Sequence, residues 1–182
     1  EGGDEVAVVQ ERKIDPLPKR RGDFRRLEVL DFSEAQCSRI ELVAGDSRVV
    51  LEKKSRKEQR DNQEVEIVYW DLLEPAAMVA EKMFVPESAD GYARSLFELK
   101  LKGPESWLGE QDPALFGLDR PDATLTFHLP RKEGNPETRT YLFSRKGRSE
   151  EGYLKKSWHG EIYSVPGLFV EDRLRRAELN FR

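Results

Sequence analysis

The sequence predicts an α+β fold built from two pseudo-repeated βββ(β)α units, with mainly antiparallel sheets packed with two helices. Three observations lead to this prediction. Short segments of alternating polar and apolar residues recur along the chain, which is typical of strands with one buried face. Two later segments carry apolar residues at helical spacing. The two halves also align without gaps near their ends, at a constant offset of 80 residues.

The first half begins with three predicted strands. Arg39–Leu42 alternates polar and apolar residues, and Arg48–Lys53 is expected to pair with it across the turn pair Gly45-Asp46. Val65–Trp70 is rich in β-branched and aromatic residues and forms the third strand. Lys54–Glu64 is almost entirely charged or amide, so we expect a long solvated hairpin loop there.

A helix is predicted from about Pro86 to Leu99. Its apolar residues recur at the spacing of one helical face: Ala89, Tyr92, Ala93, Leu96 and Phe97. Gly91 weakens this helix by about 1 kcal/mol relative to alanine. Its stability must therefore come from packing.

The second half repeats the plan. The predicted strands are Thr124–Leu129, Thr138–Ser144, Tyr153–Trp158 and Glu161–Val165, with Gly134-Asn135-Pro136 as the turn between the first two. Ser164 stands where a helix N-cap belongs, with Pro166 just inside the start. The closing helix should run to about Ala177 and bury Val170, Leu174 and Ala177. In the 80-residue alignment, Pro86 and Pro166 mark equivalent helix starts.

The expected organisation is one composite domain. Residues 1–23 form a linker or edge segment, residues 24–102 the first half and residues 103–182 the second half. Each half alone would bury too little surface to fold, so a shared core favours the pairing. A basic cluster at Arg20, Arg21, Arg25 and Arg26 is either a contact for an anionic surface or part of a solvated linker.

Composition excludes several classes of protein. With 37% hydrophobic and 36% charged residues and a net charge of −4, the chain lacks the basic character of a dedicated nucleic-acid binder. One cysteine, Cys37, permits no intrachain disulfide. No run of eighteen apolar residues is present. Because the chain begins at Glu1 rather than Met, we expect that any membrane tether lies outside these residues.

No residue pattern indicates catalysis, and we expect neither an enzyme nor a bound cofactor or metal. His128 and His159 are the histidines, and nothing near Cys37 marks an activated thiol. No His, Cys or carboxylate cluster has metal-ligand spacing. The glycines form neither a phosphate-binding loop nor a dinucleotide fingerprint.

Two short segments carry a resemblance to a known family. The first is Leu-Phe-Gly-Leu-Asp-Arg-Pro at Leu115–Pro121, which precedes an alternating strand. The second is Trp-Asp-Leu-Leu-Glu-Pro at Trp70–Pro75. With the order of strands and helix around them, over roughly residues 24 to 182, the sequence resembles the bacterial domain-of-unknown-function family 4340. It departs from the family in lacking the N-terminal membrane helix and in its longer, more charged Lys54–Glu64 segment.

The resemblance implies an extracytoplasmic, periplasmic domain tethered to the inner membrane in the full-length protein. Such domains are often encoded beside ABC-transporter components of the gliding-motility type, which would make membrane proteins the expected partners. The family has no established catalytic residues, so none are carried over. The residues of the motif itself favour a structural role: Gly117 allows a turn, Pro121 prevents helix before the strand, and Leu115, Phe116 and Leu118 anchor the crossing in the core.

Three functions are compatible with the sequence. The leading hypothesis is a non-enzymatic interaction module, accessory to a membrane transport or surface machine. The second is a small-ligand or glycan-binding domain, with a groove between the halves and Trp70, Trp107, Tyr153 or Trp158 as stacking surfaces. The third is a hydrolase with an unrecognised site. Tyr153 and Trp158 are candidates for interaction under either binding hypothesis.

Overall fold

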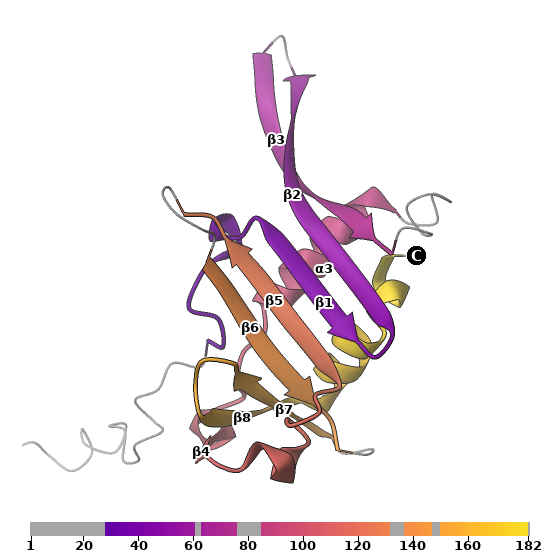
Figure 1. The fold of residues 1–182 in the computed structure, drawn as a ribbon. Coiled ribbons are helices and arrows are strands. Elements are labelled where there is room, and N and C mark those ends of the chain that lie inside the picture. The colour runs from indigo at the N-terminus through magenta and orange to yellow at the C-terminus, as the bar shows by residue number, and fades with distance from the viewer. Residues whose placement is uncertain (1–27, 61–62, 76–84, 132–136, 147–149, 182) are drawn as a thin grey trace, which may run out of the picture.

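The computed structural model describes residues 28–60, 63–75, 85–131, 137–146 and 150–181. Their strands form one antiparallel sheet of eight, in the order β3-β2-β1-β5-β6-β7-β8-β4. The helical segments pack on one face of it, so the fold is α+β (Figure 1). The predicted turn at residues 134–136, the basic cluster at Arg20, Arg21, Arg25 and Arg26, and the 1–23 linker lie outside the described residues.

The first half supplies three strands and a helix. These are β1 (Arg39–Ala44), β2 (Ser47–Arg60), β3 (Gln63–Glu74) and α3 (Pro86–Phe97), preceded by a short 3₁₀ turn η2 (Glu34–Gln36). Gly45 has φ 58°, the left-handed conformation that a tight two-residue turn requires. The Gly45-Asp46 turn is confirmed, and the predicted strands at β1 and β3 and the helix are confirmed to within a few residues, whereas β2 runs well past the predicted end at Lys53.

The second half supplies the other five strands. They are β4 (Trp107–Glu110), β5 (Ala123–Leu129), β6 (Glu137–Ser144), β7 (Glu151–Lys156) and β8 (Glu161–Pro166). Short turns η3 (Pro104–Ser106) and η4 (Pro113–Phe116) flank β4, and the helical segments η5 (Phe169–Arg175) and η6 (Ala177–Phe181) follow β8. Strand β4 was not predicted, because four residues containing a glycine give too short a pattern to detect.

The two halves meet at the centre of the sheet. There β1 pairs with β5 in antiparallel register, with Leu42 opposite Leu125 and Ile40 opposite Phe127. These side chains alternate into one buried layer together with Leu51, Leu72, Phe143 and Leu154. Against that layer pack the predicted face of α3, buried except for the partly buried Phe97, and the residues Val170, Leu174 and Ala177, which are buried as expected.

The predicted loop at Lys54–Glu64 is wrong. Strands β2 and β3 continue through this segment, with Lys57 opposite Glu66 and Gln59 opposite Glu64, almost to the hairpin tip. Charged residues form strands here because neighbouring side chains neutralise one another, both between the strands, as Lys57 Nζ does at 2.9 Å from Glu64 Oε1, and along β2, as Arg56 Nη2 does at 2.7 Å from Glu58 Oε1. The composition indicated solvent exposure correctly, but exposure does not by itself make a loop.

The predicted start of the closing helix is also wrong. Ser164 and Pro166 belong to β8, where Pro166 pairs with Glu151 at the strand end. The Gly167 N–H donates to the Glu150 carbonyl, so Pro166 and Glu151 form a non-hydrogen-bonded pair and the missing N–H of Pro166 costs no bond to β7. The segment after it is a π-helix over Phe169–Arg175, followed by a 3₁₀ turn, rather than an α-helix. Pro86 and Pro166 are therefore not at equivalent helix starts.

Candidate functional site

A pocket lies at the end of the sheet's inner face. Along three neighbouring strands, inward-facing positions change from apolar to polar toward this end: Phe143 to Arg139 on β6, Leu154 to Lys156 on β7, and Val165 to Glu161 on β8. The residues before β1 close over this polar end. The backbone of Glu28 forms an isolated antiparallel β-bridge with that of Lys100. A capping box between Ser33 and Gln36 stabilises the turn before β1.

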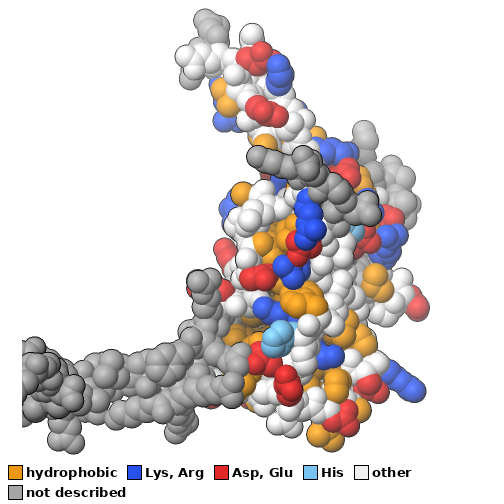
Figure 2. Space-filling view, turned by 60° about the vertical axis from the view of Figure 1, so that its left-hand side comes forward, with side chains coloured by type: hydrophobic (Ala, Val, Ile, Leu, Met, Phe, Trp, Pro, Cys, Tyr) orange, Lys and Arg blue, Asp and Glu red, His pale blue; other side chains and the backbone are white. Residues whose placement is uncertain are grey.

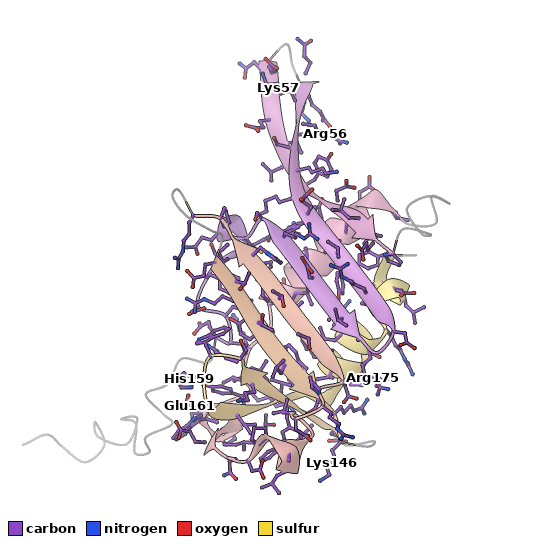
Figure 3. The ribbon with its side chains drawn as sticks, in the orientation of Figure 1. Arg56, Lys57, Lys146, His159, Glu161 and Arg175 are labelled. Atoms are coloured by element: carbon purple, nitrogen blue, oxygen red, sulfur yellow. The ribbon has the colours of Figure 1, made fainter. Side chains whose placement is uncertain are left out.

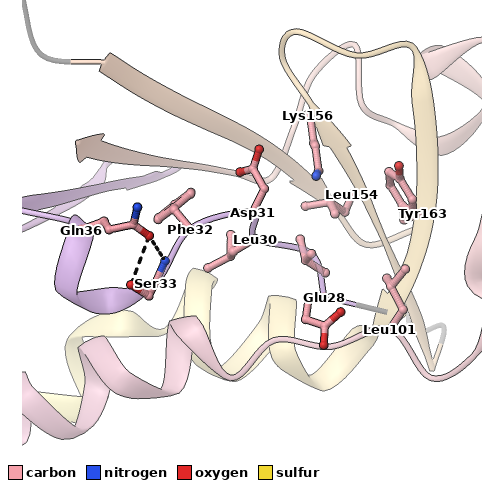
Figure 4. A pocket seen from close by; sticks show the side chains of 11 residues that line it. Glu28, Leu30, Asp31, Phe32, Ser33, Gln36, Leu101, Leu154, Lys156 and Tyr163 are labelled. Carbon is pink, nitrogen blue, oxygen red and sulfur yellow. Dashed lines mark hydrogen bonds between the residues drawn. The ribbon is translucent and has the colours of Figure 1, made fainter. Parts of the chain in front are cut away.

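The pocket has a volume of about 470 Å³. Apolar side chains from the covering segment and from the sheet form much of its wall (Figure 4). The polar lining comes from both halves of the chain. The lining residues are Glu28, Val29, Leu30, Asp31, Phe32, Ser33, Gln36, Leu101, Leu154, Lys156 and Tyr163.

Lys156 is the one basic residue of this lining. Its side chain is half-buried at the end of β7, and burial lowers the pKa of its ammonium. Within the described part of the chain it makes no ion pair or hydrogen bond, and its ammonium lies 6.0 Å from the Trp158 ring centroid. The pocket therefore contains a cation that nothing directly neutralises.

The acidic neighbours of Lys156 have other partners. Asp31 Oδ2 lies 4.0 Å from Arg139 Nη2. Glu161 accepts a 2.7 Å hydrogen bond from the Tyr163 hydroxyl and lies 3.5 Å from His159 Nδ1. Figure 3 shows His159 and Glu161 together at this end of the molecule. Both carboxylates still act on Lys156 through space, as does the guanidinium of Arg139.

Tyr141 lies beside this group with its side chain fully buried. Its hydroxyl has no hydrogen-bond partner among the described residues. Burial first, and the charge of Asp31 second, raise the pKa of its phenol. Its ring meets Trp158 edge-on at 5.3 Å, so Trp158 is fixed between Tyr141 and the Arg139 guanidinium, 4.9 Å away.

A second feature is the projecting hairpin formed by Lys54–Arg60 of β2 and Gln63–Tyr69 of β3, which we call the arm. It extends beyond the rest of the sheet (Figure 1), and acidic, basic and hydrophobic side chains intermingle on it in Figure 2. β1 pairs with β2 only over Ser47–Glu52, and β3 is an edge strand. Both long edges of the arm are thus unpaired among the described residues.

Charge is divided between the two strands of the arm. The arm's part of β2 carries Lys54, Arg56, Lys57 and Arg60, whereas the whole of β3 has no basic residue. Arg56 and Lys57 project from the arm in Figure 3, and Arg56 lies over the Tyr69 ring at 5.3 Å. Two apolar side chains remain in solvent: Val65 is 41% exposed and Val68 is 58% exposed.

The predicted structural motif lies away from both features. Gly117 has φ 72° and ends η4, where the Leu118 amide donates to the Pro113 carbonyl and the Phe116 carbonyl accepts from Ser144 Oγ. Leu118 is buried, but Leu115 is 60% exposed and does not anchor the crossing. Pro121 stands two residues before β5. Phe116 packs edge-on against Tyr153 at 4.9 Å.

The predicted aromatic surfaces do not come together. Trp70 is buried and donates from Nε1 to Glu34, with Lys53 over its ring, so it offers no stacking surface. Pro75 follows β3 after a cis peptide bond. Tyr153 packs on Phe116 and Trp158 on Tyr141, and none of the three tryptophans lines the pocket.

The described residues do not bring together a nucleophile, a general base and an orienting group in the geometry of a catalytic site. Cys37 is buried, its thiol donates to the Arg39 carbonyl, and burial raises its pKa to about 11. His128 Nε2 instead contacts Glu41 Oε1 at 3.1 Å. No three His, Cys, Asp or Glu side chains in these ranges are placed to hold a metal ion. Nor does any described helix combine the length and apolar character needed to cross a membrane.

Sequence reasoning missed both Lys156 and the pocket. Lys156 is one of two successive lysines at the end of a strand, and only the strand register decides which of the two faces inward. Comparison of the chain with protein-family models, with curated proteins and with solved structures finds no match.

Proposed function

We propose that this chain is a non-enzymatic interaction module and that the arm is its docking element. The observation that carries this proposal is the projection of a long two-stranded hairpin with both edges unpaired among the described residues. An isolated two-stranded hairpin is only marginally stable in water. A chain that maintains one therefore has a use for it beyond packing its own core.

The ion pairs of the arm leave its main chain available. Lys57–Glu64 at 2.9 Å and Lys54–Asp71 at 2.5 Å join β2 to β3. They stabilise the hairpin, while the outward N–H and C=O groups of the arm's part of β3 remain available for another strand. Addition of a partner strand to such an edge is a common mode of protein recognition, with pockets for alternate side chains giving specificity. Val65 and Val68 supply apolar contact area.

Excision of the arm tests this function. Replacing residues 55–68 by Asn-Gly would make Lys54 and Tyr69 the last pair before a two-residue turn, as Ala44 and Ser47 are around Gly45-Asp46. The variant should keep its fold and lose association with its partner. The measurement is co-purification with membrane components from cells that express the full-length protein.

A matched control keeps the arm and removes its apolar contacts. Val65→Thr with Val68→Thr retains β-branching, and therefore strand propensity, so the hairpin should persist while association weakens. If the excised variant folds and still co-purifies with every component that the unaltered protein captures, the arm is not the docking element.

The resemblance to the family 4340 domain supplies the proposed setting. We propose an extracytoplasmic location, with a membrane tether and with ABC-transporter components of the gliding-motility type as partners. Charge reversal of Arg20, Arg21, Arg25 and Arg26 should then weaken membrane or partner association in a salt-dependent way, because exposed charges act over about 8 Å at physiological ionic strength. Unchanged association of that variant at low salt would assign the cluster to a solvated linker.

The internal repeat is likewise a proposal. In support, β1, β2 and β3 follow one another outward from the centre of the sheet, as β5, β6 and β7 do on the other side. A helical segment follows each set and packs on the same face. The strands β4 and β8 have no counterpart in the first half. A superposition of residues 38–102 on 123–182 that fails to place β1, β2 and β3 on β5, β6 and β7 would contradict the relationship.

Ligand binding is the second candidate function, and the pocket favours it. The aromatic glycan groove considered from the sequence has no support, since the tryptophans do not line the pocket. An unrecognised hydrolase is the weakest candidate, because the raised pKa of Cys37 opposes a thiolate nucleophile.

A further inference from the structure

We propose that the pocket beneath residues 28–33 binds a medium-chain fatty acid, with its carboxylate at Lys156 and its alkyl chain on the apolar wall. The arm takes no part in this site. The volume of the cavity, the chemistry of its lining and the ammonium of Lys156, which has no ion pair or hydrogen bond among the described residues, support a fatty acid as the ligand.

The wall suits an alkyl chain. Leu30 and Phe32 from the covering segment line the cavity together with Leu101 and Leu154 (Figure 4), and Val29 is a further apolar lining residue. Leu154 and Val29 are buried and Leu30 and Phe32 are partly so, and all four belong to or pack against the hydrophobic core. A cavity of about 470 Å³ lies within the range of small-ligand sites, roughly 300 to 1,000 Å³.

One position in the pocket suits a negative group, and it is Lys156. The lining also carries two carboxylates: Asp31, which lies 4.0 Å from Arg139 and acts on Lys156 through space without an ion pair or hydrogen bond to it, and Glu28, which is exposed and apart from Lys156 (Figure 4). Lys156 is the cation left without a direct partner, and it sits where water is partly excluded. A desolvated ammonium gains a charge-assisted hydrogen bond when a carboxylate enters beside it.

Other ligand classes fit this lining less well. A phosphate or sulfate carries more charge than a single ammonium neutralises, and its preferred partner is a planar arginine fork. A glycan stacks on aromatic faces, and Tyr163 and Phe32 are the aromatic residues here, without any tryptophan. An apolar molecule without charge would leave Lys156 unpaired.

The test compares three ligands of equal chain length on the full chain by isothermal titration calorimetry, below their micelle concentrations. Decanoate should bind, decanol should bind more weakly, and decyltrimethylammonium should bind least. Lys156→Met keeps the apolar stem and removes the charge, so it should weaken decanoate by roughly tenfold to a hundredfold and leave decanol unchanged. Lys156→Arg should restore most of the affinity for decanoate.

Lys155→Met is the matched control. Lys155 is the preceding residue on β7 and points to the opposite face of the sheet, so its replacement should leave all three affinities unchanged. Leu30→Gln should weaken decanoate and decanol together, because it changes the apolar wall rather than the charge.

The proposal fails if the unaltered protein does not bind decanoate, if decanol binds as tightly as decanoate, or if Lys156→Met and Lys155→Met have equal effects. Thermal unfolding of each variant shows that it folds. The arm-excised variant should bind decanoate with unchanged affinity, so the docking function and the fatty-acid site can fail separately.

Discussion

Tyr141 and Lys156 lie directly opposite each other on β6 and β7, and neither polar end has a hydrogen-bond partner among the described residues. Burying a polar group without a partner costs free energy, and a desolvated charge costs more. Two such groups side by side are unusual for a site that serves packing alone. Their cost to the stability of the fold is measurable.

Tyr141→Phe should leave the free energy of unfolding unchanged or raise it by up to about 1 kcal/mol, since it removes a buried hydroxyl that has no partner. Tyr92→Phe is the matched control. The Tyr92 hydroxyl is also buried, but it donates to the Arg173 carbonyl at 2.6 Å. Its loss should cost about 1 to 2 kcal/mol. Chemical denaturation of both variants measures the difference, and equal losses would indicate that Tyr141 has a partner after all.

Lys156→Met should raise the stability of the fold at neutral pH. Burial lowers the pKa of Lys156 in the folded state, so the folded chain binds this proton less tightly than the unfolded chain does. Stability of the unaltered protein therefore rises with pH between the lowered value and the ordinary value of lysine. The gain from Lys156→Met should be largest below that window and shrink across it, whereas Lys155→Met should show no such trend. A gain independent of pH would point to packing instead.

Gly117→Ala should destabilise the fold by about 1 to 2 kcal/mol. The Gly117 φ of 72° is unfavourable for residues with a Cβ, while the space around it is adequate, with Ser144 Cβ the nearest atom at 3.7 Å. Gly91→Ala, in the exposed middle of α3, should instead stabilise by about 0.5 to 1 kcal/mol, because nothing lies within 4 Å of the added methyl. Thermal unfolding of the two variants checks that the signs are opposite.

Cys37 should give an alkaline limit to stability. Burial raises the pKa of its thiol from 9.0 to about 11, so between these values the unfolded chain releases a proton that the folded chain keeps. Stability should fall as pH rises through this window, and Cys37→Ala should remove about 1 kcal/mol of that fall near pH 10. Urea titrations of both proteins at several alkaline pH values test this, and parallel curves would exclude a contribution from the thiol.

The fold class and most elements were predictable because their signals are local. Val65–Trp70 and Thr124–Leu129 alternate along a strand, and the face of α3 from Ala89 to Phe97 follows the helical period. The Lys54–Glu64 segment escaped prediction because its charged residues form ion pairs between the strands and along β2, which composition does not reveal. The π-helix at Phe169–Arg175 was not predicted. Ser164 and Pro166 match the sequence pattern of a helix start, although both belong to strand β8.

The candidate site was not predictable, for a different reason. The pocket joins Asp31, Leu101 and Lys156, which come together only once the sheet order and register are known. The sequence suggested the tryptophans as possible stacking surfaces for a ligand. Trp70, however, is buried in the core and its indole N–H donates to Glu34. Large aromatic residues serve cores as readily as surfaces, so their presence could not locate the site.

The antiparallel joint between β1 and β5 has a consequence for synthesis of the chain. The other antiparallel pairs, apart from β4 with β8, join strands that are neighbours in sequence, whereas Leu42 meets Leu125 only after the whole first half has been made. A ribosome releases the chain from the N-terminus, so the inner edge of β1 must wait without its partner strand until β5 emerges. Pairing across such a long separation closes slowly. During that interval the nascent chain presents the unpaired edge of β1, with Ile40 and Leu42 on it, to its surroundings.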